Sequence, residues 1–217
     1  MTKSVGFVGF VGFGRFLRFT AVCVVLITVL TGLASAQSSP DTFQMGAQIT
    51  TARSGQFEST ELGIGGRVSW HPIALLGIES EIDWYPADFP GGSVPFSAAR
   101  LEGLFGVTAG TRLGSVRPFA KIRAGFLRYS PAPEPFACLA IFPPPLNCLM
   151  ATGGTRPILD IGGGLEVFSG ERTFVRLDAG DRMVQYPGPS FAAGFTLRDG
   201  EFVGHDFRLS VGGGLRF

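Results

Sequence analysis

Apolar and polar side chains alternate along most of the chain beyond residue 40. In the last thirteen residues, HDFRLSVGGGLRF, Phe207 and Leu209 share one face, and Arg208 and Ser210 share the other. A period of two residues is that of a β-strand with two chemically different faces. The pattern predicts eight such strands, near residues 42–51, 61–70, 74–85, 99–113, 117–129, 157–168, 172–184 and 203–217. No segment shows a convincing 3.6-residue period, so we expect an all-β fold.

The connections between these strands alternate between short and long. Those after the second, fourth and sixth strands are the tripeptides HPI, GSV and SGE. Those after the first, third, fifth and seventh strands span residues 52–60, 86–98, 130–156 and 185–202. Transmembrane β-barrels have short periplasmic turns and long extracellular loops. The asymmetry therefore favours an up-and-down barrel whose two ends meet different environments.

Sixteen charged side chains fall on the polar phase of the predicted strands. They are Arg67, Glu79, Glu81, Asp83, Arg100, Glu102, Arg112, Lys121, Arg123, Asp160, Glu166, Arg176, Asp178, Asp206, Arg208 and Arg216. The two signs are equal in number and interleave on adjacent strands, which suits a lumen that must neutralise its own charge. Alternation alone does not say which face is outside. A soluble lipocalin-like barrel with charges in water and a membrane barrel with charges in its lumen share this pattern.

The apolar phase favours the membrane barrel. Its runs last about ten residues, the length that a tilted strand needs to cross the hydrocarbon layer. Trp70 and Trp84 fall at opposite ends of adjacent strands, where interfacial aromatic residues belong. Arg128 and Asp181 fall on the apolar phase at the outer ends of their strands, which places them at headgroup level or after a β-bulge.

The first 36 residues have the pattern of a signal peptide. Lys3, Arg15 and Arg18 precede the apolar run AVCVVLITVLTGL, which is followed by ASA. We expect cleavage after Ala36, with an uncleaved helical anchor as the alternative, and one domain over residues 37–217. Three of the 18 basic residues lie in the leader, which leaves 15 against 17 acidic residues and nothing that suggests a nucleic-acid partner.

The alternating strands, the loop asymmetry and a final strand ending in Phe217 (FRLSVGGGLRF) resemble the bacterial outer-membrane β-barrel proteins of the small, eight-stranded OmpA-like kind. The resemblance covers essentially the whole mature chain. It implies a closed eight-stranded antiparallel transmembrane β-barrel in a Gram-negative-type outer membrane. It also implies that the terminal phenylalanine belongs to a sorting signal for the barrel-assembly machinery, and it assigns no catalytic residues.

Eight strands enclose a lumen just wide enough to be filled by side chains, so a wide diffusion pore is not expected. We expect a structural or surface-interaction protein held in outer-membrane lipid. Any conductance would be narrow and gated, and a surface ligand would bind through the extracellular loops. A soluble periplasmic ligand-binding barrel and a lipid A-modifying barrel enzyme are the alternatives. We expect no cofactor.

Three groups of residues carry candidate chemistry. Glu79, Glu81 and Asp83 offer oxygen ligands for Ca²⁺ on one strand face, but a salt-bridge stack against lumenal arginines is the favoured interpretation, so no metal is expected. Cys138 and Cys148 lie in the long loop PAPEPFACLAIFPPPLNCLM and can pair in an oxidising compartment. This apolar, proline-rich loop either contacts a partner or the membrane, or folds over the barrel mouth.

Histidine and serine near the outer leaflet would be needed for a lipid A-modifying enzyme. His205 and Ser210 are five positions apart and so lie on opposite faces of the last strand. This is poor geometry for a nucleophile and its base. We therefore expect no enzymatic activity.

Overall fold

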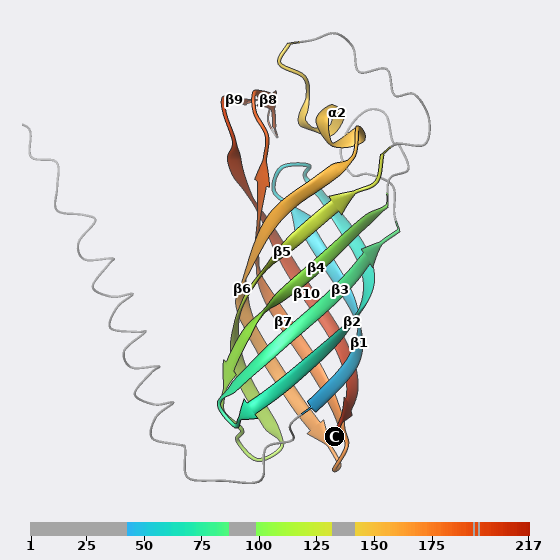
Figure 1. Ribbon diagram of the computed structural model, residues 1–217, viewed down its shortest axis with the longest axis vertical. Helices are drawn as coiled ribbons and strands as arrows, with labels where there is room; N and C mark the ends of the chain where they lie inside the picture. Colours follow the sequence, from blue (N-terminus) through green and yellow to red (C-terminus); the bar gives the residue numbers. More distant parts are fainter. Residues whose placement is uncertain (1–42, 87–98, 132–141, 193, 195) are drawn as a thin grey trace, which may run out of the picture. The chain divides into compact units, whose positions relative to one another are not determined.

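The computed structural model describes residues 43–86, 99–131, 142–192, 194 and 196–217. Eight long strands form one barrel (Figure 1): β1 (Phe43–Ser54), β2 (Ser59–Ile73), β3 (Leu76–Tyr85), β4 (Arg100–Gly110), β5 (Val116–Tyr129), β6 (Gly154–Ser169), β7 (Thr173–Tyr186) and β10 (Phe202–Arg216). The expected leader, with its cleavage site after Ala36, lies outside the described residues and stays a prediction. Among the described residues, no helix has the length and apolarity to cross a membrane.

The barrel is closed, with the strand order β1-β10-β7-β6-β5-β4-β3-β2. All eight neighbouring pairs are antiparallel, so the expected closed eight-stranded antiparallel barrel is confirmed. The seam between β1 and β10 extends from Gln44 opposite Arg216 to Ser54 opposite Asp206. Beyond it, the Phe217 amide donates to the Phe43 carbonyl at 2.9 Å. The last strand therefore has no free edge at the seam.

The connections fall into two groups, one at each end of the barrel. The short turns 74–75, 111–115 and 170–172 define what we call the turn end. The connections 55–58, 86–99, 130–153 and 187–201 define the loop end. The expected asymmetry holds, except that the predicted loop 52–60 is a four-residue turn. Because Arg53 and Thr60, which pair with each other on the outer face, are both polar, the hydrophobic alternation stops before the pairing does, and β1 and β2 stay paired to Ser54 and Ser59.

Two small elements at the loop end were not expected from the alternation. The helix α2 (Leu146–Ala151) lies in the connection after β5, and β8 (Ser190–Phe191) pairs with β9 (Leu197–Arg198) in the connection after β7. The main chains of Pro145 and Phe191 form an isolated bridge, which joins the two connections.

The outer wall of the barrel is apolar and the lumen is charged. Ile49 and Phe105 are 57% and 61% exposed on the outside, whereas Arg123 and Glu102 are fully buried inside. This polarity is the reverse of that of a soluble ligand-binding barrel and is the one that spanning a bilayer requires. The apolar phase therefore lines no cavity inside the barrel, and the lipocalin-like alternative is wrong.

Arg128 and Asp181 both point outward from unbroken strands. The pairing of Arg128 with Leu101 and of Asp181 with Ile161 falls in continuous register, so no bulge reorients either side chain. Asp181 Oδ2 lies 2.7 Å from Nδ1 of His205 on β10. Of the two explanations for these misfits, the structure rules out the bulge.

Among the described glycines of the barrel strands, Gly125 on β5 leaves the least room for a side chain. A Cβ there would lie 1.9 Å from the carbonyl oxygen of Gly103 on β4, whereas a Cβ at Gly66 on β2 would meet no atom nearer than 3.7 Å. We expect Gly125→Val to lower the free energy of unfolding by about 3 kcal/mol, because the backbones of β4 and β5 must separate. Urea unfolding in lipid vesicles, followed by tryptophan fluorescence, measures this change.

Gly66→Val is the matched control, since it adds the same side chain to a strand glycine with open space around it. We expect it to change the free energy of unfolding by less than about 0.5 kcal/mol. Equal losses in the two variants would contradict the close approach of β4 and β5.

Candidate functional site

Among the described residues, the barrel buries nine acidic and nine basic side chains. They are Glu61, Glu79, Glu81, Asp83, Glu102, Asp160, Glu166, Asp178 and Asp206, with Arg67, Arg100, Arg117, Lys121, Arg123, Arg176, Arg182, Arg208 and Arg216. The set includes fifteen of the sixteen residues on the predicted polar phase. We call it the lumenal charge network and take it as the candidate site.

The sequence pattern missed three members of this network. Arg182 shares the phase of Arg176 and Asp178 on β7, so extending the alternation by two positions would have found it. Glu61 and Arg117 are the first residues of their predicted strands, where only one neighbour defines the phase.

One predicted member lies elsewhere. Arg112 follows the last residue of β4 and belongs to the turn 111–115, where its Nε donates to the Gly114 carbonyl at 3.1 Å. Its guanidinium stacks 4.4 Å from the centroid of the Phe168 ring. Arg112 thus lies in a turn and not on a strand, because β4 ends at Gly110, three residues before the predicted boundary, but its guanidinium stacks on the same buried Phe168 ring as that of Arg216.

Arg123 of β5 lies at the centre of the network. Its Nη1 donates to Glu79 Oε1 at 2.7 Å and to Glu81 Oε2 at 2.6 Å, both on β3. Its Nε donates to Asp160 Oδ2 on β6 at 2.9 Å. One guanidinium therefore binds three carboxylates on two strands, and the charge-assisted, forked geometry is the kind that arginine favours.

Arg176 joins opposite walls of the barrel. It lies on β7, four strands away from β3 in either direction around the barrel, and its Nη2 donates to Glu79 Oε1 at 3.1 Å. Its Nε donates to Asp178 Oδ2 at 3.0 Å. Asp178 also binds Arg67 Nη1 from β2 at 3.0 Å and Lys121 Nζ from β5 at 2.5 Å. These bonds cross the full width of the lumen.

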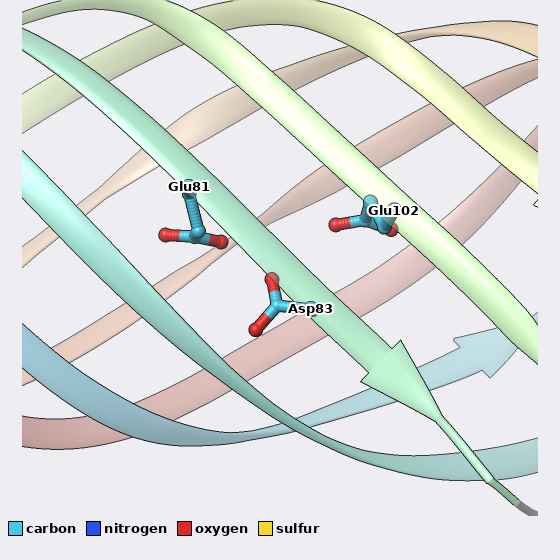
Figure 2. Close-up of side chains that lie close together, drawn as sticks. All are labelled: Glu81, Asp83 and Glu102. Carbon is cyan, nitrogen blue, oxygen red and sulfur yellow. The ribbon is translucent and has the colours of Figure 1, made fainter.

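Three carboxylates meet at the next level toward the loop end. Figure 2 shows Glu81 and Asp83 on β3 and Glu102 on β4, whose oxygens lie within 4.8 Å of one another. Arg208 of β10 lies among them: its Nη2 binds Glu81, and also Asp83 Oδ2 at 2.6 Å, while its Nε is 3.1 Å from Glu102 Oε1. Gln48 Nε2 donates to Asp83 Oδ1 at 2.7 Å. A guanidinium thus occupies the position that a metal ion would take.

Arg182 carries the network further toward the loop end. Its Nη1 binds Glu102 Oε2 at 2.6 Å and its Nη2 binds Asp206 Oδ2 at 2.8 Å. Glu61 lies 3.8 Å from the same Nη2 and 3.4 Å from Arg100 Nη1. The two residues that sequence reasoning missed here, Arg182 and Glu61, therefore connect Glu102 and Asp206 to Arg100.

The turn end of the lumen holds a smaller group. Arg117 Nη1 contacts Glu166 Oε2 at 3.1 Å and His71 Nε2 at 2.8 Å. Arg216 donates to the carbonyls of Gly170 and Glu171 in the turn after β6, at 3.2 Å and 2.5 Å. Its guanidinium also lies 4.8 Å from the Phe168 ring centroid. The lumenal charges at this end are bound by a turn as well as by other strands.

An apolar cap closes the lumen above the charges at the loop end. It consists of the inward side chains Leu104, Leu127, Tyr129, Ile158, Val184 and Tyr186, with Phe57 and with Leu146, Met150 and Ala151 from α2 and its end. The Tyr129 and Tyr186 hydroxyls are 3.3 Å apart, and the Phe57 and Tyr186 rings meet edge to face at 5.9 Å. Of the two expectations for the long loop after β5, the described part folds over the barrel mouth.

Cys148 lies on α2 and is disulfide-bonded. Its expected partner, Cys138, lies outside the described residues.

The expected mismatch of His205 and Ser210 holds in the structure. Ser210 is buried in the lumen, whereas His205 is exposed on the outer wall. The two side chains therefore lie on opposite sides of the sheet and cannot act together on one substrate.

No protein-family model matches the chain, and no curated protein matches it. Several solved structures are similar in architecture. Neisserial surface protein A is 15% identical, with 81% of this chain and 97% of that chain covered and a TM-score of 0.49. Ail of Yersinia pestis, in complex with the heparin analogue sucrose octasulfate, is 11% identical, with 81% and 97% covered and a TM-score of 0.46. The outer membrane protein OprG of Pseudomonas aeruginosa is 9% identical, with 81% and 94% covered and a TM-score of 0.44.

The network predicts how the barrel responds to loss of one charge. Arg123→Gln leaves Glu79, Glu81 and Asp160 without their shared guanidinium. We expect it to lower the free energy of unfolding by about 3–5 kcal/mol, since the buried network is left with one uncompensated negative charge. Arg128→Gln changes the same residue type on the same strand but on the exposed outer face, and we expect a change below about 0.5 kcal/mol. Urea unfolding in vesicles compares the two variants, and equal effects would contradict a lumenal role for Arg123.

Proposed function

We propose that this protein is an integral outer-membrane barrel with a structural or surface-interaction role and at most a narrow, gated conductance. The observation that carries the proposal is the chain of ion pairs across the full lumen, from Glu79 on β3 to Arg176 on β7. A pore-forming barrel needs an aqueous path between its ends, and here guanidinium groups and carboxylates fill that path.

The placement in a membrane is supported by the apolar outer wall. Trp70 and Trp84 lie on it at opposite ends of the β2–β3 hairpin, as interfacial aromatic residues do. A leader with cleavage after Ala36 would export the chain, and the terminal Phe217 would direct it to the barrel-assembly machinery. Outer-membrane lipid is then the permanent partner of this wall.

The surface-interaction role is supported by the difference between the two ends of the barrel. The turn end has only three short turns, whereas the loop end carries α2 and the β8–β9 hairpin, bridged between Pro145 and Phe191. Loops held by secondary structure can present a defined surface to a ligand at low entropic cost. The side chain of Phe142 is 83% exposed at this end.

Cell fractionation tests the placement. We expect the protein in the outer-membrane fraction, with a gel mobility in detergent that changes on boiling, because a closed barrel stays folded until heated. Recovery from the soluble periplasm without a mobility change would overturn the proposal.

Liposome swelling tests the closed lumen. We expect vesicles that contain the folded protein to take up glucose no faster than protein-free vesicles, while a general porin reconstituted in parallel gives rapid swelling. A swelling rate that increases with the amount of folded barrel would show that the ion pairs leave an open path, and would contradict this part of the proposal.

A further inference from the structure

The outer wall has a hollow of about 730 Å³ across β10, β1, β2 and β3. We call it the wall groove and define it by its outward-facing residues Ala47, Ile49, Ile64, Ile82, Trp84 and Val211. It is apolar and lies within the band that we propose faces lipid.

Ala47 lines the hollow, and glycines flank Ala47 on both neighbouring strands. Ala47 on β1 pairs with Gly66 on β2 and with Gly213 on β10, so three adjacent outward positions lack any side chain beyond Cβ. Close approach of strands does not require the glycine at position 66, because a Cβ there would meet no atom nearer than 3.7 Å. The barrel therefore has room for a larger side chain at position 66, beside the groove.

A positively charged side chain, Arg53, lies beyond the groove toward the loop end. Arg53 on β1 points outward, opposite Phe207 of β10, and contacts no carboxylate in the described part of the chain. Its neighbour in the next outward position on β10 is His205, which is bonded to Asp181 at 2.7 Å. The nearby carboxylate is thus already engaged, and the guanidinium of Arg53 is available to an anion.

The spacing between the cation and the groove matches a lipid molecule. Arg53 and Ile49 are separated by four residues of β1, or about 13 Å at about 3.3 Å per residue. One leaflet contributes about 15 Å of hydrocarbon. A headgroup at Arg53 would therefore place its acyl chain along Ile49 and down to Ala47.

We propose that the wall groove and Arg53 together bind one molecule of a phosphate-bearing membrane lipid. The guanidinium donates hydrogen bonds to the phosphate oxygens in the planar, forked geometry that suits them, and an acyl chain fills the groove. The inference rests on the membrane placement proposed above. A second copy of the chain fits less well, because a two-fold contact would set hollow against hollow and Arg53 near Arg53.

Native mass spectrometry of the folded protein in detergent tests the site, with phosphatidylglycerol as the probe and diacylglycerol of the same chains as the phosphate-free comparison. We expect one phosphatidylglycerol per barrel and at least tenfold weaker binding of diacylglycerol. Arg53→Gln should weaken phosphatidylglycerol binding about tenfold, because a charge-assisted contact of roughly 1.5 kcal/mol is lost. Ala47→Leu should weaken it at least as much by filling the groove.

Two variants on the opposite wall are matched controls. Arg128→Gln removes an outward arginine from β5, and Ala120→Leu enlarges an outward alanine of the same strand. We expect both to bind phosphatidylglycerol like the unaltered protein. Equal losses in Arg53→Gln and Arg128→Gln, or no effect of Ala47→Leu, would overturn the site. Dimers that Ala47→Leu abolishes would overturn it in favour of self-association.

The gel shift on boiling is recorded for every variant, so a barrel that fails to fold is recognised separately. If Ala47→Leu fails to fold, Val211→Phe, which enlarges another residue lining the groove, replaces it. Because fractionation decides the membrane placement independently, a folded outer-membrane barrel that binds no lipid would overturn this inference alone.

Discussion

Neutralisation of charge inside a narrow lumen is the interaction on which the rest of this structure depends. The wall is a single sheet in which side chains alternate between its two faces. Each strand therefore presents its apolar side chains outward and its polar and charged side chains inward. A slip of one residue in any pairing would turn Arg123 or Glu79 toward the outside and an isoleucine toward the carboxylates. The ion pairs and the apolar outer wall therefore specify the same register, and each reinforces the other.

The lumen is organised in layers along the barrel. Charges fill it from Arg117 at the turn end to Arg182 near the loop end, and the apolar cap with α2 lies above them. The bonds from Arg176 and Arg208 to β3 connect strands that are not neighbours in the sheet. They act as cross-braces, which the sheet hydrogen bonds alone cannot supply. These bonds are consistent with the structural role proposed above.

The strands and their faces could be predicted because each follows from a local period of two. The predictions that failed depend on contacts between residues that are far apart in the sequence. Arg112 was assigned to a strand because the end of β4 depends on where the chain turns. The first loop was drawn too long because Arg53 and Thr60 interrupt the hydrophobic pattern without interrupting the pairing. The partners of Arg123 depend on how the strands are staggered around the barrel, which no single strand reveals. The apolar cap escaped notice because Leu127 and Val184 occupy the polar phase, and they are explained only by α2.

The seam between β1 and β10 has a consequence for the order of events during folding. Its two strands are the first and last of the barrel, and six other long strands separate them in sequence. Loop-closure entropy opposes this pairing most strongly, so the seam is expected to form after the hairpins. Until then, β1 and β10 each present a row of unpaired amides and carbonyls next to Arg208 and its neighbours, without the carboxylates of β3 in place. The unfinished barrel thus has two unpaired strand edges and lumenal charges without their partners. This is the state that offers a chaperone or assembly factor the most surface to bind.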